Sequence, residues 1–486
     1  MLFARAGVAL QAILFAASCG YGRTEPEPLR GRRAQLSHLL RRAAFGADPA
    51  TLDEYERLGL NGAVERLLDV SDGEEDLDKR LVGLGLDRRK LGDLQRWWLL
   101  RMAYTQHPLR EKMILFWHGL LTSGSAKVGL PNPTPQNPNP PHYLLDQHTF
   151  FRAHALDTYG SILSGIARDP AMMIWLDAQT NNKNRPNENF ARELMELFTI
   201  GADGFAETDV REVARAFTGR ALDNGRYVFR PTNFDTGIKT VLGKSGAFKG
   251  DDVLELLAAH PRTAERLARR LWSHFAFPNP TERDVRPLVA AYVRTNGSVA
   301  EMLRVMFKSP EFYSPRAYRS LVKGPVDYVV GMIRSFKVTV GGANLPGVTT
   351  RMGQALFNPP NVAGWPGGVN WLNTTTWVER VNFANHVVTA RNDTNTMAPQ
   401  LSLMLEREGL RTPEQVVEYF GAFLLDGQMS AHLRQTVLAY LKGGSGEASP
   451  ALIGGAKNRS FSPAFVDQRV RGLVYLILAS PEYQLA

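Results

Sequence analysis

The sequence predicts an all-α fold with one small β-hairpin and long loops rich in Pro, Gly and Asn. Apolar residues recur at three- and four-residue spacings along most of the 486 residues, which is the period of an amphipathic helix. Strand-like patterning is confined to residues 221–249. The composition, 44% apolar and 22% charged, is typical of a globular protein, and no apolar run approaches the roughly 20 residues that cross a membrane. Disorder throughout the chain and a polytopic membrane protein are therefore excluded.

Residues 1–18 have the three parts of a secretory signal peptide: a basic residue, Arg5, then an apolar stretch, then small residues before the exit. Cys19 follows at once and is the only cysteine, which excludes an internal disulfide and a zinc site built on several thiolates. The segment ending in Cys19 resembles the lipobox of bacterial lipoproteins, in which the cysteine is acylated. We expect a lipid on Cys19 to anchor the protein to the membrane of the cell envelope. The alternative is cleavage near Ala17, which leaves a soluble periplasmic or secreted protein.

Residues 19–33 are expected to form a flexible tether between this anchor and the rest of the chain. The chain holds 57 Lys and Arg against 48 Asp and Glu, a formal net charge of +9. It contains no nucleic-acid recognition motif and no basic recognition helix, so nucleic acid is not an expected partner. The positive charge instead suits anionic lipid or an acidic polymer of the envelope.

Residues 34–486 are predicted to form a single large helical domain. Six prolines between residues 131 and 141 must interrupt the helices, because proline lacks the N–H that a helix uses. Two short runs, 226–230 and 239–242, are separated by Asn, Asp and Gly, and we expect them to pair as a hairpin within an insertion at 221–249. In chain order the predicted elements are helices over about 34–122, the Pro-rich loop 131–141, helices over 143–218, the hairpin insertion 221–249, helices over 251–336, a loop that turns into a helix over 356–386, and helices to the C-terminus around a Gly/Ser-rich loop near 443–455.

The densest polar segment of the chain covers residues 169–198. A buried stripe is expected from its apolar residues at helical spacing, which are Phe190, Leu194 and Leu197. A salt-bridge ladder on the outer face is expected from charged residues at four-residue steps, which are Glu188, Arg192 and Glu196.

Glu193 belongs to neither set. On a helix it lies about 60° from Phe190, beside the buried stripe, and Asn189 lies on the same flank. A carboxylate partly withdrawn from water needs a partner or has a raised pKa, and a raised pKa suits a general acid or base. The alternative is a structural carboxylate paired with Arg211 or Arg215 of the next helix.

Two histidines, His118 and His154, accompany apolar helices. Either could supply acid–base chemistry near neutral pH, and either could equally be a hydrogen-bonded core residue. Neither has a second ligand-type residue four positions on, so we predict no metal site, and the sequence assigns no cofactor.

Three tryptophans and several asparagines share the segment 358–382. Trp365, Trp371 and Trp377 lie among Asn residues that include Asn373. Aromatic faces beside neutral amides suit hydroxyl-rich ligands such as sugars, because rings stack and amides bond hydroxyls. The alternative is a structural loop in which the indoles anchor a helical core and the Asn side chains hold turns.

These features lead to two functional hypotheses. The first is an envelope enzyme that acts on a polymer or glycan, with Glu193 as acid or base, His154 or Asp177 assisting, and Glu188 and Asn189 in the same catalytic segment. In that hypothesis the substrate is bound by side chains of the polar segment and of the tryptophan loop, namely Arg192, Trp365, Trp371 and Asn373. The second is a non-catalytic envelope adaptor or binding protein, in which the same polar cluster is structural.

The chain also resembles a bacterial family known only as domain of unknown function 1800. The resemblance covers nearly all of residues 34–486 and rests on the segments 38–46, 115–118, 169–177, 186–194, 209–219, 357–368 and 480–486. It implies a secreted, mainly helical protein, often encoded beside a second uncharacterised secreted protein that would be a candidate partner, and it implies no established reaction. The chain departs from the family pattern at Leu120, where a second histidine is common, and at Arg220, where tryptophan is expected.

Overall fold

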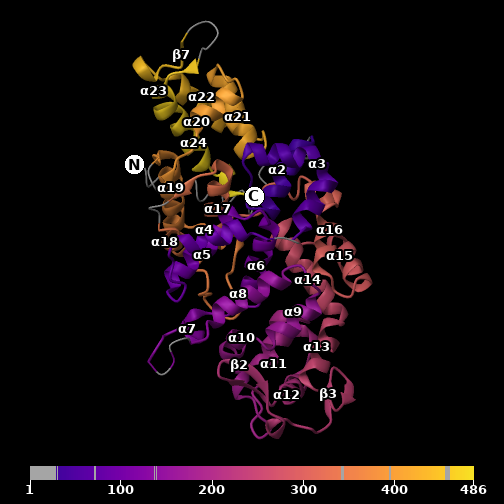
Figure 1. Cartoon of the computed structure of the whole chain (residues 1–486). Coiled ribbons are helices and arrows are strands. Elements are labelled where there is room, and N and C mark those ends of the chain that lie inside the picture. The colour runs from indigo at the N-terminus through magenta and orange to yellow at the C-terminus, as the bar shows by residue number, and fades with distance from the viewer. Residues whose placement is uncertain are drawn as a thin grey trace. The chain divides into compact units, whose positions relative to one another are not determined.

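Figure 1 shows the computed structural model of the chain, which describes residues 29, 31–70, 73–135, 137, 140–340, 344–392, 396–454 and 460–486. Most described residues lie in helices, and the strands form only two-stranded antiparallel pairs. The predicted mostly helical fold with a small β-hairpin is therefore confirmed.

The N-terminal expectations stay predictions. The signal peptide, Cys19 and the tether as far as residue 28 lie outside the described residues. Within the described ranges, none of the helices combines the length and the apolar character that crossing a bilayer requires.

The chain divides into two compact units, each built from separate stretches of sequence. Unit 1 holds the residues up to Ala63, then Tyr313–Gln354 and Gly367–Ala486; unit 2 holds Val64–Phe312 and Ala355–Pro366. The single domain expected over 34–486 stays a prediction. Helix α3 (Pro49–Leu68) begins in unit 1 and ends in unit 2, with a break at Gly59, where φ is 68°.

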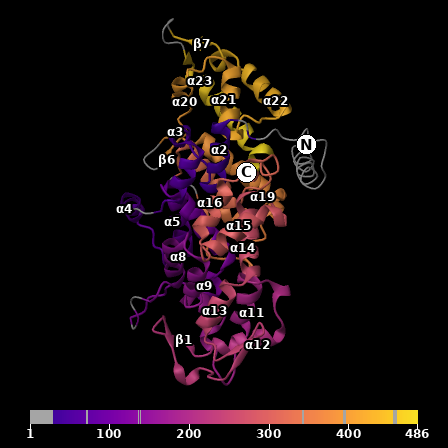
Figure 2. The ribbon, with the colours of Figure 1, turned by 90° about the vertical axis from the view of Figure 1, so that its right-hand side faces the viewer.

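Unit 2 contains the polar segment singled out from the sequence. Its helices are α4 (Glu75–Gly83), α5 (Leu91–Tyr104), α6 (Pro108–Leu120), α7 (Ser125–Val128), α8 (Tyr143–His154), α9 (Tyr159–Ile166), α10 (Pro170–Trp175), α11 (Asn189–Glu193), α12 (Glu207–Ala216), α13 (Gly250–Ala258), α14 (Pro261–Phe275), α15 (Glu282–Arg294) and α16 (Val299–Phe307). Shorter 3-10 or π turns are η1 (Ala178–Thr180), η2 (Leu194–Phe198), η3 (Ala202–Gly204) and η4 (Pro231–Asn233), and η5 (Pro310–Tyr313) crosses into unit 1. Both views show α9, α11, α12 and α13 gathered at one end of this unit (Figures 1 and 2).

Unit 1 is built around the C-terminal helices. Its elements are α2 (Arg32–Ala43), α17 (Pro325–Phe336), β5 (Thr339–Val340), α18 (Leu345–Arg351), η6 (Gly368–Trp371), α19 (Thr374–Thr389), β6 (Thr396–Met397), α20 (Leu401–Arg407), α21 (Pro413–Leu425), α22 (Ala431–Lys442), η7 (Gly446–Ala448), β7 (Leu452–Ile453), β8 (Ser460–Phe461), α23 (Pro463–Phe465), η8 (Val466–Val470), α24 (Arg471–Leu478) and η9 (Glu482–Gln484). The strands pair as β5 with β6 and β7 with β8. Helices α20 to α23 lie together in both views (Figures 1 and 2).

The hairpin insertion holds two strand pairs where the sequence predicted one. β1 (Arg220–Asp223) pairs with β2 (Arg226–Phe229), and β3 (Lys239–Val241) pairs with β4 (Lys244–Gly246). The two predicted runs do form strands, but each pairs with its own neighbour in sequence, so the predicted pairing of 226–230 with 239–242 is wrong. The reason is turn chemistry: the two residues of each turn, Asn224-Gly225 and Leu242-Gly243, all have positive φ, as a type I′ turn requires.

Local chemistry sets the start of the helix that leads to the candidate site. Asp169 accepts the backbone N–H of Met172 at 2.8 Å, and Pro170 is the first residue of α10. An Asp cap followed by proline is a strong helix start, because the carboxylate satisfies a free N–H and proline has none to satisfy. The sequence thereby determines where α10 begins.

The core of unit 2 encloses two carboxylates and three guanidiniums. Glu74 accepts N–H groups from Arg110, at 3.1 Å, and from Arg152, while Glu111 forms ion pairs with Arg152 and, at 3.4 Å, with Arg101. The carboxylate of Glu111 is fully buried. An unpaired buried charge is costly, so these groups stabilise the fold only while all of their partners stay in place. The network joins α5, α6 and α8 to the turn before α4.

Glu74 is strongly held in its ionised form. Burial alone would raise its pKa, but the Thr105 hydroxyl, the guanidiniums of Arg152 and Arg110 and the backbone N–H of Gln106 outweigh burial and lower the pKa to about 2. Since the ordinary value is 4.5, ionised Glu74 binds its partners more strongly in the folded chain than it binds water when unfolded.

We expect the free energy of unfolding to fall as the pH is lowered through this interval. The contribution of Glu74, about 3 kcal/mol at most, is complete above pH 4.5 and disappears as the pH falls through the folded pKa of about 2. Urea unfolding across the interval measures it. Glu74→Gln should be less stable at neutral pH and should lose this part of the pH dependence. The exposed neighbour gives the control, Glu75→Gln, which should keep it; equal pH slopes in wild type and Glu74→Gln would contradict the assignment.

Candidate functional site

The candidate site begins where α11 passes into a π-helix. α11 ends at Glu193, and η2 follows without a break as a π-helix, whose hydrogen bonds span one residue more than those of an α-helix. The longer turn explains a difference from the predicted stripe. Phe190 and Leu194 are buried as expected, but Leu197 is only half-buried, and Met195 and Phe198 lie in the core.

Glu193 is a half-buried carboxylate with no hydrogen-bond or ion-pair partner among the residues that the structure describes. Burial raises its pKa, the negative charge of Glu196 raises it further, and Arg192 opposes both effects. A carboxyl group in these surroundings keeps its proton to a higher pH than an exposed one. This is the property that a general acid requires.

The two arginines expected as structural partners of Glu193 do not bind it. Arg215 donates from Nε to Asp235 at 2.8 Å and from Nη1 to both carboxylate oxygens of Glu212. Within the described part of the chain, no ion pair joins Arg211 to Glu193. Structural pairing therefore does not account for this carboxylate.

The expected ladder on the outer face exists in part. Arg192 contacts Glu188 at 3.4 Å, as the four-residue spacing predicts. Its stronger contacts go to Glu207 on α12, where both carboxylate oxygens accept from it at 2.8 and 2.7 Å. Glu196 has no ion pair with Arg192 among the described residues, because the π turn shifts it out of the four-residue register. Arg192 is thus occupied by two carboxylates.

The loop between α10 and α11 joins Asp177 to the start of α11. Asp177 has a left-handed backbone, with φ of 58°, and its Oδ2 accepts from Lys127 Nζ at 2.8 Å. Asn187 donates to the carbonyl of Asp177 at 3.1 Å, and Asn189 donates to the carbonyl of Leu176 at 3.2 Å. The structure therefore brings Asp177 and Asn189 into one hydrogen-bonded loop at the base of the helix that ends in Glu193.

His154 is held elsewhere on unit 2. Its Nδ1 lies 2.7 Å from a carboxylate oxygen of Asp157, its ring is 4.7 Å from that of Phe150, and its side chain is 40% exposed. No hydrogen bond or ion pair in the described ranges joins His154 to Glu193 or Asp177. The predicted assisting histidine is thus a surface residue with its own carboxylate partner.

His118 is a core residue, and its hydrogen bond explains why. Its Nε2 accepts the backbone N–H of Phe357 at 3.0 Å, which requires a neutral ring, and burial lowers its pKa to about 3. Phe357 has a left-handed backbone, with φ of 59°. His118 therefore fastens the strained start of the 355–366 loop to α6 rather than acting as acid or base.

A polar cluster that the sequence did not predict lies near His118, because Trp98 packs against both His118 and His148. Gln147 donates its amide to Ser123 at 2.9 Å and to Asp169 at 2.7 Å, and burial raises the pKa of Asp169 to about 7. His148 is 3% exposed, and neither of its ring nitrogens has a hydrogen-bond partner in the described structure. The sequence signal that could have identified His148 as buried is its helical spacing from two buried residues, Leu144 and Phe151.

The predicted tryptophan loop divides between the two units. In unit 2, half-buried Trp365 packs on His118 with ring centroids 5.4 Å apart. In unit 1, Trp371 is only 8% exposed, and Asn373 accepts the N–H of Thr376 at 3.0 Å as the N-cap of α19. Burial of the indole and capping by the amide are structural roles for Trp371 and Asn373. Half-buried Trp377 follows on the first turn of α19.

No metal centre is formed by the described residues: nowhere in those ranges do three His, Cys, Asp or Glu side chains gather as they would around an ion. Two half-buried carboxylates of the polar segment, Glu193 and Glu196, have no hydrogen-bond or ion-pair partner among the described residues.

Comparison with known proteins gives a family and nothing finer. A family model described as "Protein of unknown function (DUF1800)" matches residues 38–485. No curated protein and no solved structure matches the chain.

The two buried histidines predict opposite responses to substitution. His118→Leu should lower the free energy of unfolding by about 1–3 kcal/mol, because it leaves the N–H of Phe357 without an acceptor. His148→Leu should change it by less than about 1 kcal/mol, or raise it, because it removes a buried polar ring that has no partner. Urea unfolding of both variants at neutral pH measures the difference. Equal losses would contradict the assigned contacts.

Proposed function

The chain belongs to the DUF1800 family of proteins of unknown function, and we propose that it is a cell-envelope enzyme that acts on a polymer, with a glycan as the substrate class. Glu193 is its general acid. The observation that carries this proposal is the partnerless, half-buried state of Glu193 among the described residues, together with its raised pKa.

A second carboxylate accompanies Glu193. Cleavage of a glycosidic bond uses one carboxylic acid to protonate the leaving oxygen and one carboxylate to activate water or attack the sugar. Glu193 suits the first role because its surroundings favour the protonated form. Glu196, three residues on in the π-helix, also has no hydrogen-bond or ion-pair partner among the described residues and suits the second role.

The other predicted residues support the site rather than react. Asp177 is engaged by Lys127, and Asn189 by the carbonyl of Leu176, so both hold the loop that leads into α11. Glu188 and Arg192 form an ion pair on the exposed side of α11. His154 is occupied by Asp157, and we assign it no step.

Several residues that the sequence predicted to bind substrate have structural roles in the fold. Trp371 and Asn373 have structural roles in unit 1, and Trp365 packs on His118 in unit 2 with part of its surface exposed. Since Arg192 is occupied by Glu188 and Glu207, Trp365 is the predicted binding residue that remains a candidate in unit 2.

A non-catalytic envelope adaptor is the second candidate function. The observation that favours it is that the polar groups around Glu193 are largely occupied by each other: Asn187 bonds the carbonyl of Asp177, and Arg192 binds Glu207. Such a protein would bind an envelope glycan or a co-encoded secreted protein without converting it. The two functions differ in whether Glu193 is needed for a reaction.

We expect the mature protein to cleave at least one member of a panel of glycan and peptidoglycan fragments. Glu193→Gln should reduce turnover by about 10²–10⁴-fold without lowering the melting temperature, because it removes an acid but no structural contact. The control is Glu282→Gln, at an exposed carboxylate of α15, which should keep full activity. Turnover retained in Glu193→Gln, or loss of folding in place of activity, would support the adaptor instead.

The pH profile tests the same assignment. A general acid must be protonated, so the rate should fall as the pH rises through the raised pKa of Glu193. Arg192→Gln should shift this alkaline limb to higher pH, because it removes the positive charge that lowers that pKa. An unshifted limb would assign the titration to another group.

The expected location has its own test. If Cys19 carries a lipid, labelled fatty acid should enter the wild-type protein in a bacterial host and should fail to enter Cys19→Ala. Fractionation of both proteins supplies the second readout, since the variant should leave the membrane fraction. Absence of label from the wild-type protein would favour the soluble periplasmic or secreted alternative.

A further inference from the structure

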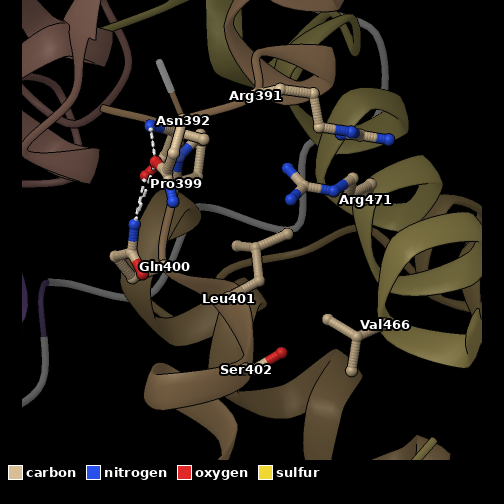
Figure 3. Close-up of a pocket in the computed structure, with 9 residues that line it drawn as sticks. Arg391, Asn392, Pro399, Gln400, Leu401, Ser402, Val466 and Arg471 are labelled. Atoms are coloured by element: carbon tan, nitrogen blue, oxygen red, sulfur yellow. Dashed lines mark hydrogen bonds between the residues drawn. The ribbon is translucent and has the colours of Figure 1, made fainter. Parts of the chain in front are cut away.

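A groove in unit 1 combines two arginines with an apolar wall. A cavity of about 140 Å³ lies between the end of α19, the segment that enters α20, and the start of α24. A second cavity of about 450 Å³ shares Ser402, Val466 and Arg471 with the first, so the two form one groove. Figure 3 shows the side chains that line the first cavity.

The two arginines of the groove share one carboxylate. Arg471 donates from Nε to Asp467 Oδ1 at 2.7 Å, and Arg391 donates from Nη2 to Asp467 Oδ2 at 2.9 Å. Two positive charges therefore meet one negative charge, which leaves the groove with a net charge of about +1. Each carboxylate oxygen of Asp467 accepts from one arginine, so Asp467 holds the two guanidiniums close together.

Arg471 is pre-oriented for an anionic ligand. Its Nη1 donates to the carbonyl of Val388 at 2.7 Å, and its side chain is only 16% exposed. Its Nη2 has no acceptor among the described residues, and Figure 3 shows the guanidinium directed into the cavity, toward Pro399. A partly desolvated guanidinium with free N–H donors binds a carboxylate strongly, because the planar fork matches its two oxygens.

The other residues that line the cavity suit a ligand with one apolar face and with hydroxyl groups along its edges. Leu401 and Val466 form an apolar wall. Opposite them, Asn392 uses its Oδ1 to accept the N–H of Ala398 at 2.8 Å, and Gln400 uses its amide N–H to bond the carbonyl of Ala398 at 2.9 Å. The amide nitrogen of Asn392 and the amide oxygen of Gln400 remain without partners in the described structure. One donor and one acceptor are thus left for ligand hydroxyls.

We propose that this groove binds a sugar acid of the hexuronate class. The ring carboxylate binds Arg471 and Arg391, the ring hydroxyls bind the amides of Asn392 and Gln400, and the apolar face of the ring packs on the wall of Leu401 and Val466. The second cavity continues the groove past Ser402 and Gln468, which provides room for a further residue of an acidic polysaccharide. The proposal deepens the proposed function by naming the polymer as acidic. The step from a bound sugar acid to a polymer substrate rests on the proposed function, whereas binding of the sugar acid itself does not.

Binding can be measured apart from any turnover. Calorimetric titration of the mature protein with glucuronate is the test, with glucose as the neutral probe and acetate and inorganic phosphate as small anions. We expect glucuronate to bind more tightly than any of the three, and binding to weaken as salt is added. Equal binding of acetate or phosphate would reduce the groove to a simple anion site and overturn the proposal, as would equal binding of glucose.

Three charge variants sharpen the test. Arg391→Gln, at a side chain that is 60% exposed, should weaken glucuronate binding about tenfold without lowering the melting temperature. Asp467→Asn should tighten binding, because it releases both arginines from a competing carboxylate. Arg434→Gln, which breaks an exposed ion pair with Glu418 in the same unit, is the charge-matched control and should change nothing. Unchanged binding in the first two variants, or an equal loss in all three, would overturn the proposal.

The catalytic variant separates the two proposals. Glu193→Gln should bind glucuronate as the wild type does. If that variant also keeps full activity on the glycan panel while glucuronate binding holds, the proposed function fails and the groove stands. If turnover depends on Glu193 but no sugar acid binds, the groove fails and the function stands.

Discussion

Two buried carboxylates, Glu74 and Glu111, are the constraint on which the interior of unit 2 depends. Each withdraws a charge from water, and the charge is balanced by arginines of α5, α6 and α8, namely Arg101, Arg110 and Arg152. Removal of any member would leave an unpaired charge in the core, which is costly. These ion pairs therefore hold α5, α6 and α8 in fixed positions relative to one another. Helix α6 carries His118 and α8 carries Gln147 and His148, so the position of the buried polar cluster follows from this network.

Unit 1 obeys the same rule with a different set of residues. Its buried Asp426 accepts from Arg41 and, at 2.6 Å, from the hydroxyl of Ser37, and fully buried Arg380 donates to the carbonyl of Lys323 at 2.8 Å. Buried charges in both units thus find charged or carbonyl partners. Glu193 differs from these groups, because its half-buried carboxylate has no hydrogen-bond or ion-pair partner among the described residues.

The sequence predicted the features that depend on local periodicity and missed those that depend on backbone register. The helices and the burial of Phe190 and Leu194 follow from 3.6-residue spacing. The predicted hairpin pairing was wrong because Asn224-Gly225 forms a two-residue turn that pairs Arg226–Phe229 with the strand before it. Partners are harder still, because they lie far apart in sequence. Neither the pairing of Arg192 with Glu207 nor the exposure of His154 could be derived from spacing alone.

Both candidate sites adjoin a π-helix, η2 beside Glu193 and η8 beside Arg471. The same property of the π-helix affects the side chains of both sites. A π-helix gives up the usual hydrogen-bond spacing, so it persists only where other contacts compensate. At η2 the hydroxyl of Thr199 bonds the carbonyl of Leu194 at 2.7 Å, and at η8 the N–H of Arg471 returns to the carbonyl of Val466. In each case the inserted residue shifts the next turn of side chains out of α-helical register. At η2 this separates Glu196 from Arg192 and leaves it beside Glu193; at η8 the residue that closes the π turn is the arginine directed into the groove. Deleting the extra residue of either π turn would therefore move Glu196 or Arg471 out of its present position.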